Sequence, residues 1–308
     1  MNATNAVLAA PTTAAGYSSI VVSAPDGLRL HVRDYRSRAD SALPVVCLPG
    51  LARTAGDFHA LATALASDQA APRRVLALDY RGRGESDHDP NPENYSLPVE
   101  LADLRAVLTA LGVAPAIFIG TSRGGILTML LAAAQPTAIA GAILNDIGPV
   151  IEPQGLLRIK GYVGKLPQPR TFDEGAQILK RLFDAQFPNL TDAEWNDAAR
   201  LTWIERDGQI RLSYDPQLSR TLATFDVDRP VPPLWAQFDA LSAMPLMLIR
   251  GGLSDLLSAA TVTAMQARRG DMEIVEIADQ GHPPLLGASD MIRRIATFCR
   301  GCDESTAR

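Results

Sequence analysis

Ser122 lies in a sequence that could make its hydroxyl group a nucleophile. The segment Gly120-Thr121-Ser122-Arg123-Gly124 fits the pattern Gly-x-Ser-x-Gly and joins the apolar run AIFIG to the helical pattern ILTMLLAAA. A sharp strand-to-helix turn of this kind exposes the serine, and its glycines avoid side-chain clashes. The helix N-terminus beneath the serine favours developing negative charge. The alternative is that Ser122 only caps the helix.

A serine hydroxyl is a weak nucleophile at its free pKa, so this hypothesis requires a histidine base. Of the four histidines, His282 alone follows a late apolar strand, in the turn sequence ADQGHPP. The other three lie in an early strand, in the first helix and in a polar loop: His31, His59 and His88. We therefore predict that His282 accepts the proton of Ser122, the alternative being a solvated loop histidine.

Two aspartates compete for the role of the acid that orients His282. Asp255 follows the apolar run LMLIRG and gives the chain order serine, aspartate, histidine, which one class of serine hydrolases uses. Asp146, in AILND, also ends a strand that neighbours the strand of the serine. We predict Asp255 as the acid, which stays ionised and stabilises the imidazolium. Asp146 is the alternative.

Arg123 raises a separate question, because its side chain carries a permanent charge beside the candidate nucleophile. The guanidinium could bind a substrate carboxylate, or it could pair with a nearby acid and brace the turn. Burying a guanidinium without a partner is costly, and we predict that Arg123 pairs with Asp146. Arg53, in LART, raises the same question, and there the sequence favours neither role.

The elements that must position these residues alternate between short β-branched runs and longer helical patterns. This alternation predicts an α/β fold, in which helices cover both faces of a mostly parallel sheet. The expected strands span residues 19–24, 29–34, 44–49, 74–79, 116–120, 141–145, 245–251 and 272–277.

The alternation stops between residues 148 and 233, where amphipathic stretches lie between proline-rich turns. Residues 191–205 predict a helix there, which begins with Thr191 and Glu194 at the spacing of a capping box. The predicted division is a flexible arm, an α/β core in two parts and a mainly helical cap: residues 1–17, 18–147 with 234–308, and 148–233.

Five motifs occur in order along the chain: LPGLART, LDYRGRGESD, GTSRGG, RGGLSD and QGHPP. With these motifs the chain resembles cap-bearing enzymes of the α/β-hydrolase fold over nearly its whole length. The resemblance implies a mostly parallel, eight-stranded sheet flanked by helices, with an inserted and mainly helical cap. The sequences LNDIGP and WAQFDAL are most similar to those of bacterial esterases, enol-lactone hydrolases and meta-cleavage product hydrolases.

The same resemblance implies an oxyanion hole made of the backbone NH groups of Leu51 and Arg123. Many relatives have His-Gly where this chain has Pro49-Gly50, a difference that leaves the backbone donor in place. The cap is expected to supply apolar walls to the substrate site, although such residues more often form a cap's own core. The candidate substrate-binding residues are Arg53, Trp195, Trp203 and Phe187.

The composition and the net charge disfavour several classes of partner and cofactor. The net charge is only −5 and the basic residues are scattered, which disfavours nucleic acid and anionic lipid. No stretch approaches the roughly 20 apolar residues that span a bilayer, and the first residues lack the charged start of a secretory signal. Three cysteines are too few for a disulfide framework, and no metal-binding motif such as His-Glu-x-x-His occurs.

We therefore expect a cytoplasmic monomer or homodimer that uses no cofactor or metal and acts on a small molecule. The predicted activity is hydrolysis of a small or medium carboxylic ester or lactone through an acyl-enzyme. Two alternatives remain: hydrolysis of a carbon–carbon bond in a vinylogous diketone, and a receptor that uses the capped pocket without catalysis.

Overall fold

A nine-stranded sheet lies at the centre of the computed structural model, which describes residues 7–9, 16–36, 42–228 and 231–306. In spatial order the strands are β1 (Val7–Ala9), β2 (Ser18–Ser23), β3 (Arg29–Tyr35), β5 (Val75–Leu78), β4 (Val45–Leu48), β6 (Ala116–Thr121), β7 (Ile139–Asn145), β10 (Leu246–Gly251) and β11 (Glu273–Ile277). Eight of these strands confirm the sequence prediction. The ninth strand, β1, lies in the segment predicted as a flexible arm and pairs antiparallel with β2. Residues 1–6 and 10–15 of that arm lie outside the described residues.

The six strands from β5 to β11 run parallel to one another. Every residue of the central strands β4 and β6 is buried, as their unbroken apolar sequences require. In parallel strands the carboxyl ends meet at one edge of the sheet, which is where such folds bind ligands. The residues that follow β4, β6, β7 and β11 are therefore brought together at that edge.

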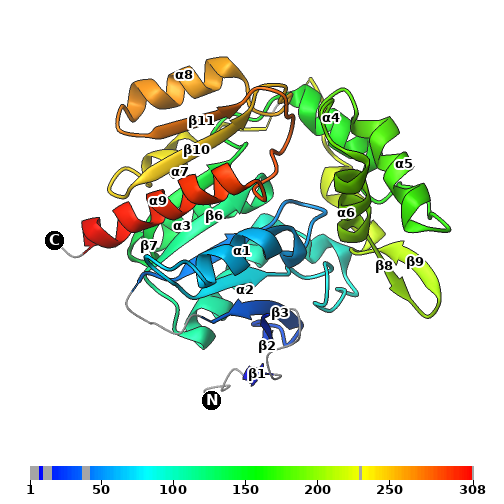
Figure 1. The fold of residues 1–308 in the computed structure, drawn as a ribbon, viewed down its shortest axis with the longest axis horizontal. Helices are drawn as coiled ribbons and strands as arrows, with labels where there is room; N and C mark the ends of the chain where they lie inside the picture. Colours follow the sequence, from blue (N-terminus) through cyan, green and yellow to red (C-terminus); the bar gives the residue numbers. More distant parts are fainter. Residues whose placement is uncertain (1–6, 10–15, 37–41, 229–230, 307–308) are drawn as a thin grey trace.

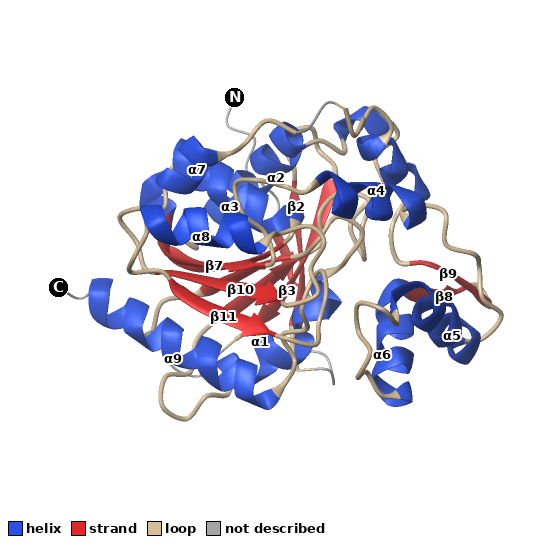
Figure 2. Ribbon diagram, turned by 90° about the horizontal axis from the view of Figure 1, so that it is seen from above, coloured by secondary structure: helices blue, strands red, loops and turns tan. Residues whose placement is uncertain are grey.

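Helices cover both faces of the sheet (Figure 2). Helices α1 (His59–Ala66) and α9 (Ser289–Thr306) pack on one face, and α2 (Leu97–Leu111), α3 (Arg123–Ala134), α7 (Trp235–Asp239) and α8 (Ala259–Arg268) pack on the other. Each face has its own apolar core, with Phe118 and Leu127 in one and Ile119 and Ile295 in the other. Among the described residues, no helix is both long and apolar enough to cross a membrane.

Residues 148–228 and 231–233 add no strand to the large sheet, and they extend beside its carboxyl edge (Figure 1). We call the segment 148–233 the cap. Its elements are α4 (Pro153–Tyr162), α5 (Phe172–Phe183), α6 (Asp192–Thr202), β8 (Trp203–Arg206), β9 (Gln209–Leu212) and the 3-10 helix η4 (Pro216–Leu222). The capping box of Thr191 and Glu194 that begins α6 is confirmed.

The hairpin of β8 and β9 differs from the prediction, which continued the helix to residue 205. Arg206 pairs with Gln209, so the loop contains only Asp207 and Gly208, with φ angles of 54° and 70°. Two positive φ angles in a two-residue loop fit the type I′ turn that Asp-Gly favours. The local turn signal therefore overrides the helical pattern before it.

Candidate active site

Ser122 sits on a strained turn between β6 and α3. Its φ and ψ angles are 51° and −112°, a region that a residue with a side chain seldom adopts. The turn is closely packed, because a Cβ atom on Gly124 would lie 2.0 Å from the carbonyl oxygen of Leu48. A Cβ atom on Gly120 would lie 2.5 Å from the backbone of Gly124. Both glycines of the motif are thus required for the turn to form.

His282 lies in the loop after β11, and the structure places it beside Ser122. Its Nε2 atom is 2.9 Å from Ser122 Oγ, a hydrogen-bond distance. Only 5% of the His282 surface is exposed, so its ring is held by the surrounding protein. This arrangement is the one in which an imidazole can take a proton from the hydroxyl group.

The carboxylate on the other side of His282 belongs to Asp146, which directly follows β7. Asp146 Oδ2 is 2.7 Å from His282 Nδ1, and the residue is completely buried. The NH of Gly251 donates to Oδ1 at 2.8 Å, and the hydroxyl of Ser254 donates to Oδ2 at 2.5 Å. These bonds fix the carboxylate in line with the imidazole.

The prediction that Asp255 orients His282 is therefore wrong. Its carboxylate is bound by the guanidinium of Arg158, a residue of α4, at 2.6 and 2.8 Å. Asp255 lies four residues beyond the end of β10 and turns toward the cap, whereas Asp146 follows β7 directly. Burial would raise the pKa of Asp255, but the hydrogen bonds and charge of Arg158, with smaller contributions from Gln186 and His282, together hold this pKa below its ordinary value.

Arg123 braces the turn as predicted, but its partner is Glu100 of α2 and not Asp146. Arg123 Nε donates to Glu100 Oε2 at 2.6 Å, and Nη2 donates to the carbonyl of Tyr95 at 3.3 Å. Sequence reasoning missed Glu100, although a signal was present. Glu100 lies on the same helical stripe as the buried Leu104 and Val107, and a carboxylate on such a stripe needs a partner.

Two backbone NH groups are available beside Ser122. The loop after β4 passes close to it, since a Cβ atom on Gly50 would lie 3.9 Å from Ser122 Cβ. Within the described ranges, the NH groups of Leu51 and Arg123 take part in none of the turn and cap hydrogen bonds. Both are therefore free to donate to an oxygen atom of a ligand.

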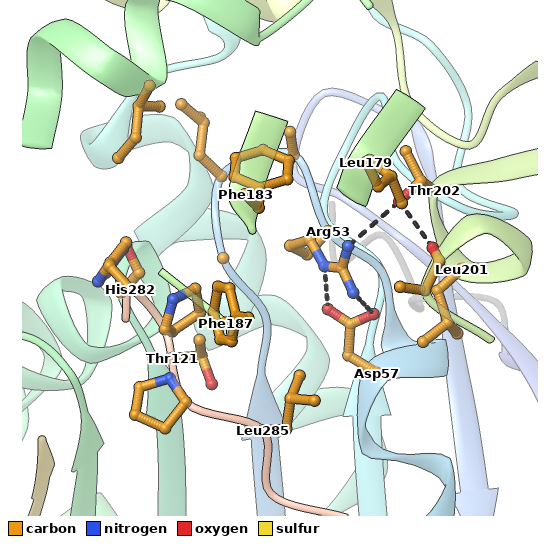
Figure 3. Close-up of a pocket in the computed structure, with 18 of the residues that line it drawn as sticks. Arg53, Asp57, Thr121, Leu179, Phe183, Phe187, Leu201, Thr202, His282 and Leu285 are labelled. Atoms are coloured by element: carbon orange, nitrogen blue, oxygen red, sulfur yellow. Dashed lines mark hydrogen bonds and ion pairs between the residues drawn. The ribbon is translucent and has the colours of Figure 1, made fainter. Parts of the chain in front are cut away.

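A cavity of about 200 Å³ lies between the cap and the edge of the sheet that carries Ser122. Its walls are mainly apolar, and several of their side chains are shown in Figure 3. The predicted wall residues Trp195 and Phe187 line the cavity. Trp203 is not among the lining residues and is completely buried in the core of the cap, against Gly175. Its large apolar ring is used for packing within the cap.

Arg53 and Asp57 form a polar group in this cavity, on the opposite side from His282 (Figure 3). Arg53 Nε and Nη2 donate to the two oxygens of Asp57 at 2.6 and 2.8 Å. The third nitrogen, Nη1, makes one long bond of 3.4 Å to the hydroxyl of Thr202 in the cap. Arg53 thus retains hydrogen-bonding capacity toward the cavity.

Comparison with known proteins gives consistent matches. Residues 45–297 match the model of the alpha/beta hydrolase family. A 3-hydroxybutyrate-oligomer hydrolase from Cupriavidus necator is 34% identical over 264 residues, 83% of this chain and 88% of that protein. The crystal structure of an alpha/beta hydrolase from Novosphingobium aromaticivorans is 39% identical, with a TM-score of 0.86 over 94% of this chain and 99% of that chain. The sn-1-specific diacylglycerol lipase ABHD11 of Mus musculus is 37% identical over 112 residues, 36% of this chain and 35% of that protein.

Proposed function

Since the chain belongs to the alpha/beta hydrolase family, we propose that it is a serine hydrolase that cleaves a carboxylic ester or lactone through an acyl-enzyme. One observation carries this proposal: the continuous hydrogen bonds from Ser122 through His282 to Asp146, at 2.9 and 2.7 Å. They connect a nucleophile, a base and an acid in the arrangement that activates a serine.

In the proposed reaction, Ser122 Oγ attacks the carbonyl carbon while His282 Nε2 takes its proton. Asp146 holds the imidazole in the correct tautomer and stabilises the imidazolium. The NH groups of Leu51 and Arg123 bind the negatively charged oxygen of the tetrahedral intermediate. When the intermediate collapses, the imidazolium protonates the leaving alcohol. Water then attacks the acyl-enzyme by the same steps and releases the acid.

The lining of the cavity favours a small substrate that carries an oxygen atom besides those of the ester group that is cleaved. Its apolar walls suit a short hydrocarbon chain, and Arg53 offers a donor across the cavity from His282. Because Asp57 already neutralises the guanidinium, a second carboxylate would leave uncompensated charge in an apolar cavity. We therefore propose that Arg53 binds an uncharged oxygen, such as the second ester carbonyl of a hydroxy-acid oligomer. The 3-hydroxybutyrate-oligomer hydrolase is named for substrates of this class.

The reaction class is tested by a panel of p-nitrophenyl esters, lactones and vinylogous diketones, each incubated with the purified protein. We expect turnover of short-chain esters, with hydroxy-acid esters preferred, and no cleavage of the diketones. Turnover of a diketone without any ester hydrolysis would favour the carbon–carbon bond reaction. Tight binding of a panel member without turnover would favour a receptor.

Removing the polar group of the cavity is expected to change selectivity. The double variant Arg53→Met/Asp57→Leu removes both charges and leaves neither buried alone. A hydrogen bond to a charged group contributes about 1.5–3 kcal/mol. We therefore expect kcat/KM for a p-nitrophenyl 3-acyloxybutyrate to fall at least about tenfold.

A hydrocarbon ester of the same chain length is the control substrate for this variant. Its kcat/KM should be unchanged or higher, because it has no oxygen atom for Arg53 to bind. Equal losses for the two esters would show that Arg53 does not recognise the substrate.

A further inference from the structure

Glu100 joins two arginines in a buried bridge behind the candidate oxyanion hole. Its Oε2 atom accepts from Arg123 Nε at 2.6 Å, and its Oε1 atom accepts from Arg83 Nη1 at 2.7 Å. The side chains of Glu100 and Arg83 are 0% exposed, and that of Arg123 is 12% exposed. Two guanidinium groups thus share one fully buried carboxylate.

Each arginine of the bridge is connected to one of the two free backbone NH groups. Arg123 supplies the first donor itself, since its NH follows Ser122 in the turn. Arg83 reaches the second, because its Nε atom donates to the carbonyl oxygen of Leu51 at 2.8 Å. Both the carbonyl and the NH of Leu51 flank one Cα atom, so holding the carbonyl restricts the direction of the NH. Among the described residues, no residue besides Glu100 forms hydrogen bonds to both arginine side chains.

Glu100 stays charged within the bridge, although burying charged groups costs free energy. Burial raises the pKa of Glu100, but the two guanidinium groups lower it by more, and Glu100 therefore stays ionised. Arg83 Nη2 is buried and has no hydrogen-bond partner in the described part of the chain. A buried donor without a partner destabilises a fold, which favours a role for Arg83 beyond packing.

We propose that Glu100 and Arg83 are positioning residues, which hold the NH groups of Leu51 and Arg123 at the separation that an oxyanion requires. This role depends on the serine hydrolase function proposed above. The two donors come from different segments, the loop after β4 and the first residue of α3, and the bridge links these segments. Because transition-state stabilisation depends on preorganised donors, a small displacement of one NH reduces the rate.

The decisive variant is Glu100→Gln. Glutamine keeps the shape of the side chain but offers one acceptor oxygen and one NH₂ group. Its NH₂ group would face an arginine donor, so the hydrogen bond to one of the two arginines must break. We expect kcat to fall about 10²-fold, with KM changed less than about threefold. The inhibition constant of a boronic acid, which forms a tetrahedral adduct on Ser122, should rise by a factor similar to the loss in kcat.

Asp103→Asn is the matched control on the same helix. Asp103 is 3% exposed and binds Arg81 Nε and Nη2 at 2.7 Å each, but Arg81 makes no side-chain contact with Leu51 or Arg123. Loss of this ion pair should lower the Tm without a comparable loss in kcat.

Arg83→Lys is a milder second variant, because one ammonium cannot reproduce a guanidinium fork. It should lower kcat about tenfold with the same shift in boronic acid binding.

If Glu100→Gln and Asp103→Asn lower the Tm but leave kcat and boronic acid binding equal to those of the wild type, the bridge is only structural and the proposal is wrong. In that case an active wild type still supports the serine hydrolase function. A wild type that hydrolyses no ester overturns both proposals.

Discussion

Asp146→Asn is expected to lower kcat for ester hydrolysis about 10⁴-fold, the loss seen when the acid of such a triad becomes an amide. Asparagine has nearly the same shape, so Gly251 can still donate to its oxygen. With its oxygen on Gly251, its NH₂ group faces His282 Nδ1 and donates to it, which places the imidazole proton on Nε2 and leaves no acceptor there for the proton of Ser122. Steady-state kinetics on a p-nitrophenyl ester, with the Tm as a check of folding, measures this loss.

Asp255→Asn is the matched control, because Asp255 is the acid that the sequence analysis predicts. Its carboxylate pairs with Arg158 of the cap, and both side chains are partly exposed, at 27% and 22%. Such pairs contribute about 0–1 kcal/mol, so kcat should stay within about fivefold of the wild type. A larger loss for Asp255→Asn than for Asp146→Asn would return the role of the acid to Asp255.

Ser122→Ala should abolish nearly all activity, with a fall in kcat of about 10⁶-fold. Alanine also has a Cβ atom, so the strained turn at φ 51° is no less compatible with it than with serine. The loss can then be assigned to the missing nucleophile, provided that the Tm remains close to that of the wild type. A variant that retains more than about 1% of the wild-type kcat would exclude an acyl-enzyme on Ser122.

The double variant Ser122→Ala/Asp146→Asn provides a further check. Residues that act as one unit give strongly non-additive losses. We therefore expect the double variant to be no slower than Ser122→Ala alone. Additive losses would mean that Asp146 acts independently of the nucleophile.

The sequence was sufficient to predict eight of the nine strands, the turn at Ser122 and the place of His282. These features depend on local patterns: apolar strands, glycines in a crowded turn, and a histidine after a late strand. The choice between Asp146 and Asp255 depends on tertiary geometry. Both aspartates precede His282 and follow the neighbouring strands β7 and β10, so neither chain order nor spacing separates them.

The buried stripe of α2 indicates that Glu100 needs a partner, but the sequence does not show that this partner is Arg123. Glu100 lies 23 residues away on a different helix, and its pairing depends on how α2 packs beside α3. The predicted partner, Asp146, follows β7, which is adjacent to β6. Its carboxylate instead accepts from His282, Gly251 and Ser254. Adjacency of strands does not determine which way an end residue points.

The central claim, that Ser122 forms an acyl-enzyme, is tested most directly by intact-protein and peptide mass spectrometry. The protein is mixed with a p-nitrophenyl ester, quenched in acid during turnover and digested. We expect the mass of one acyl group on the peptide that contains Ser122 in the wild type and none in Ser122→Ala. An acyl group on another residue, or turnover of the wild type without any acylated peptide, would contradict this account.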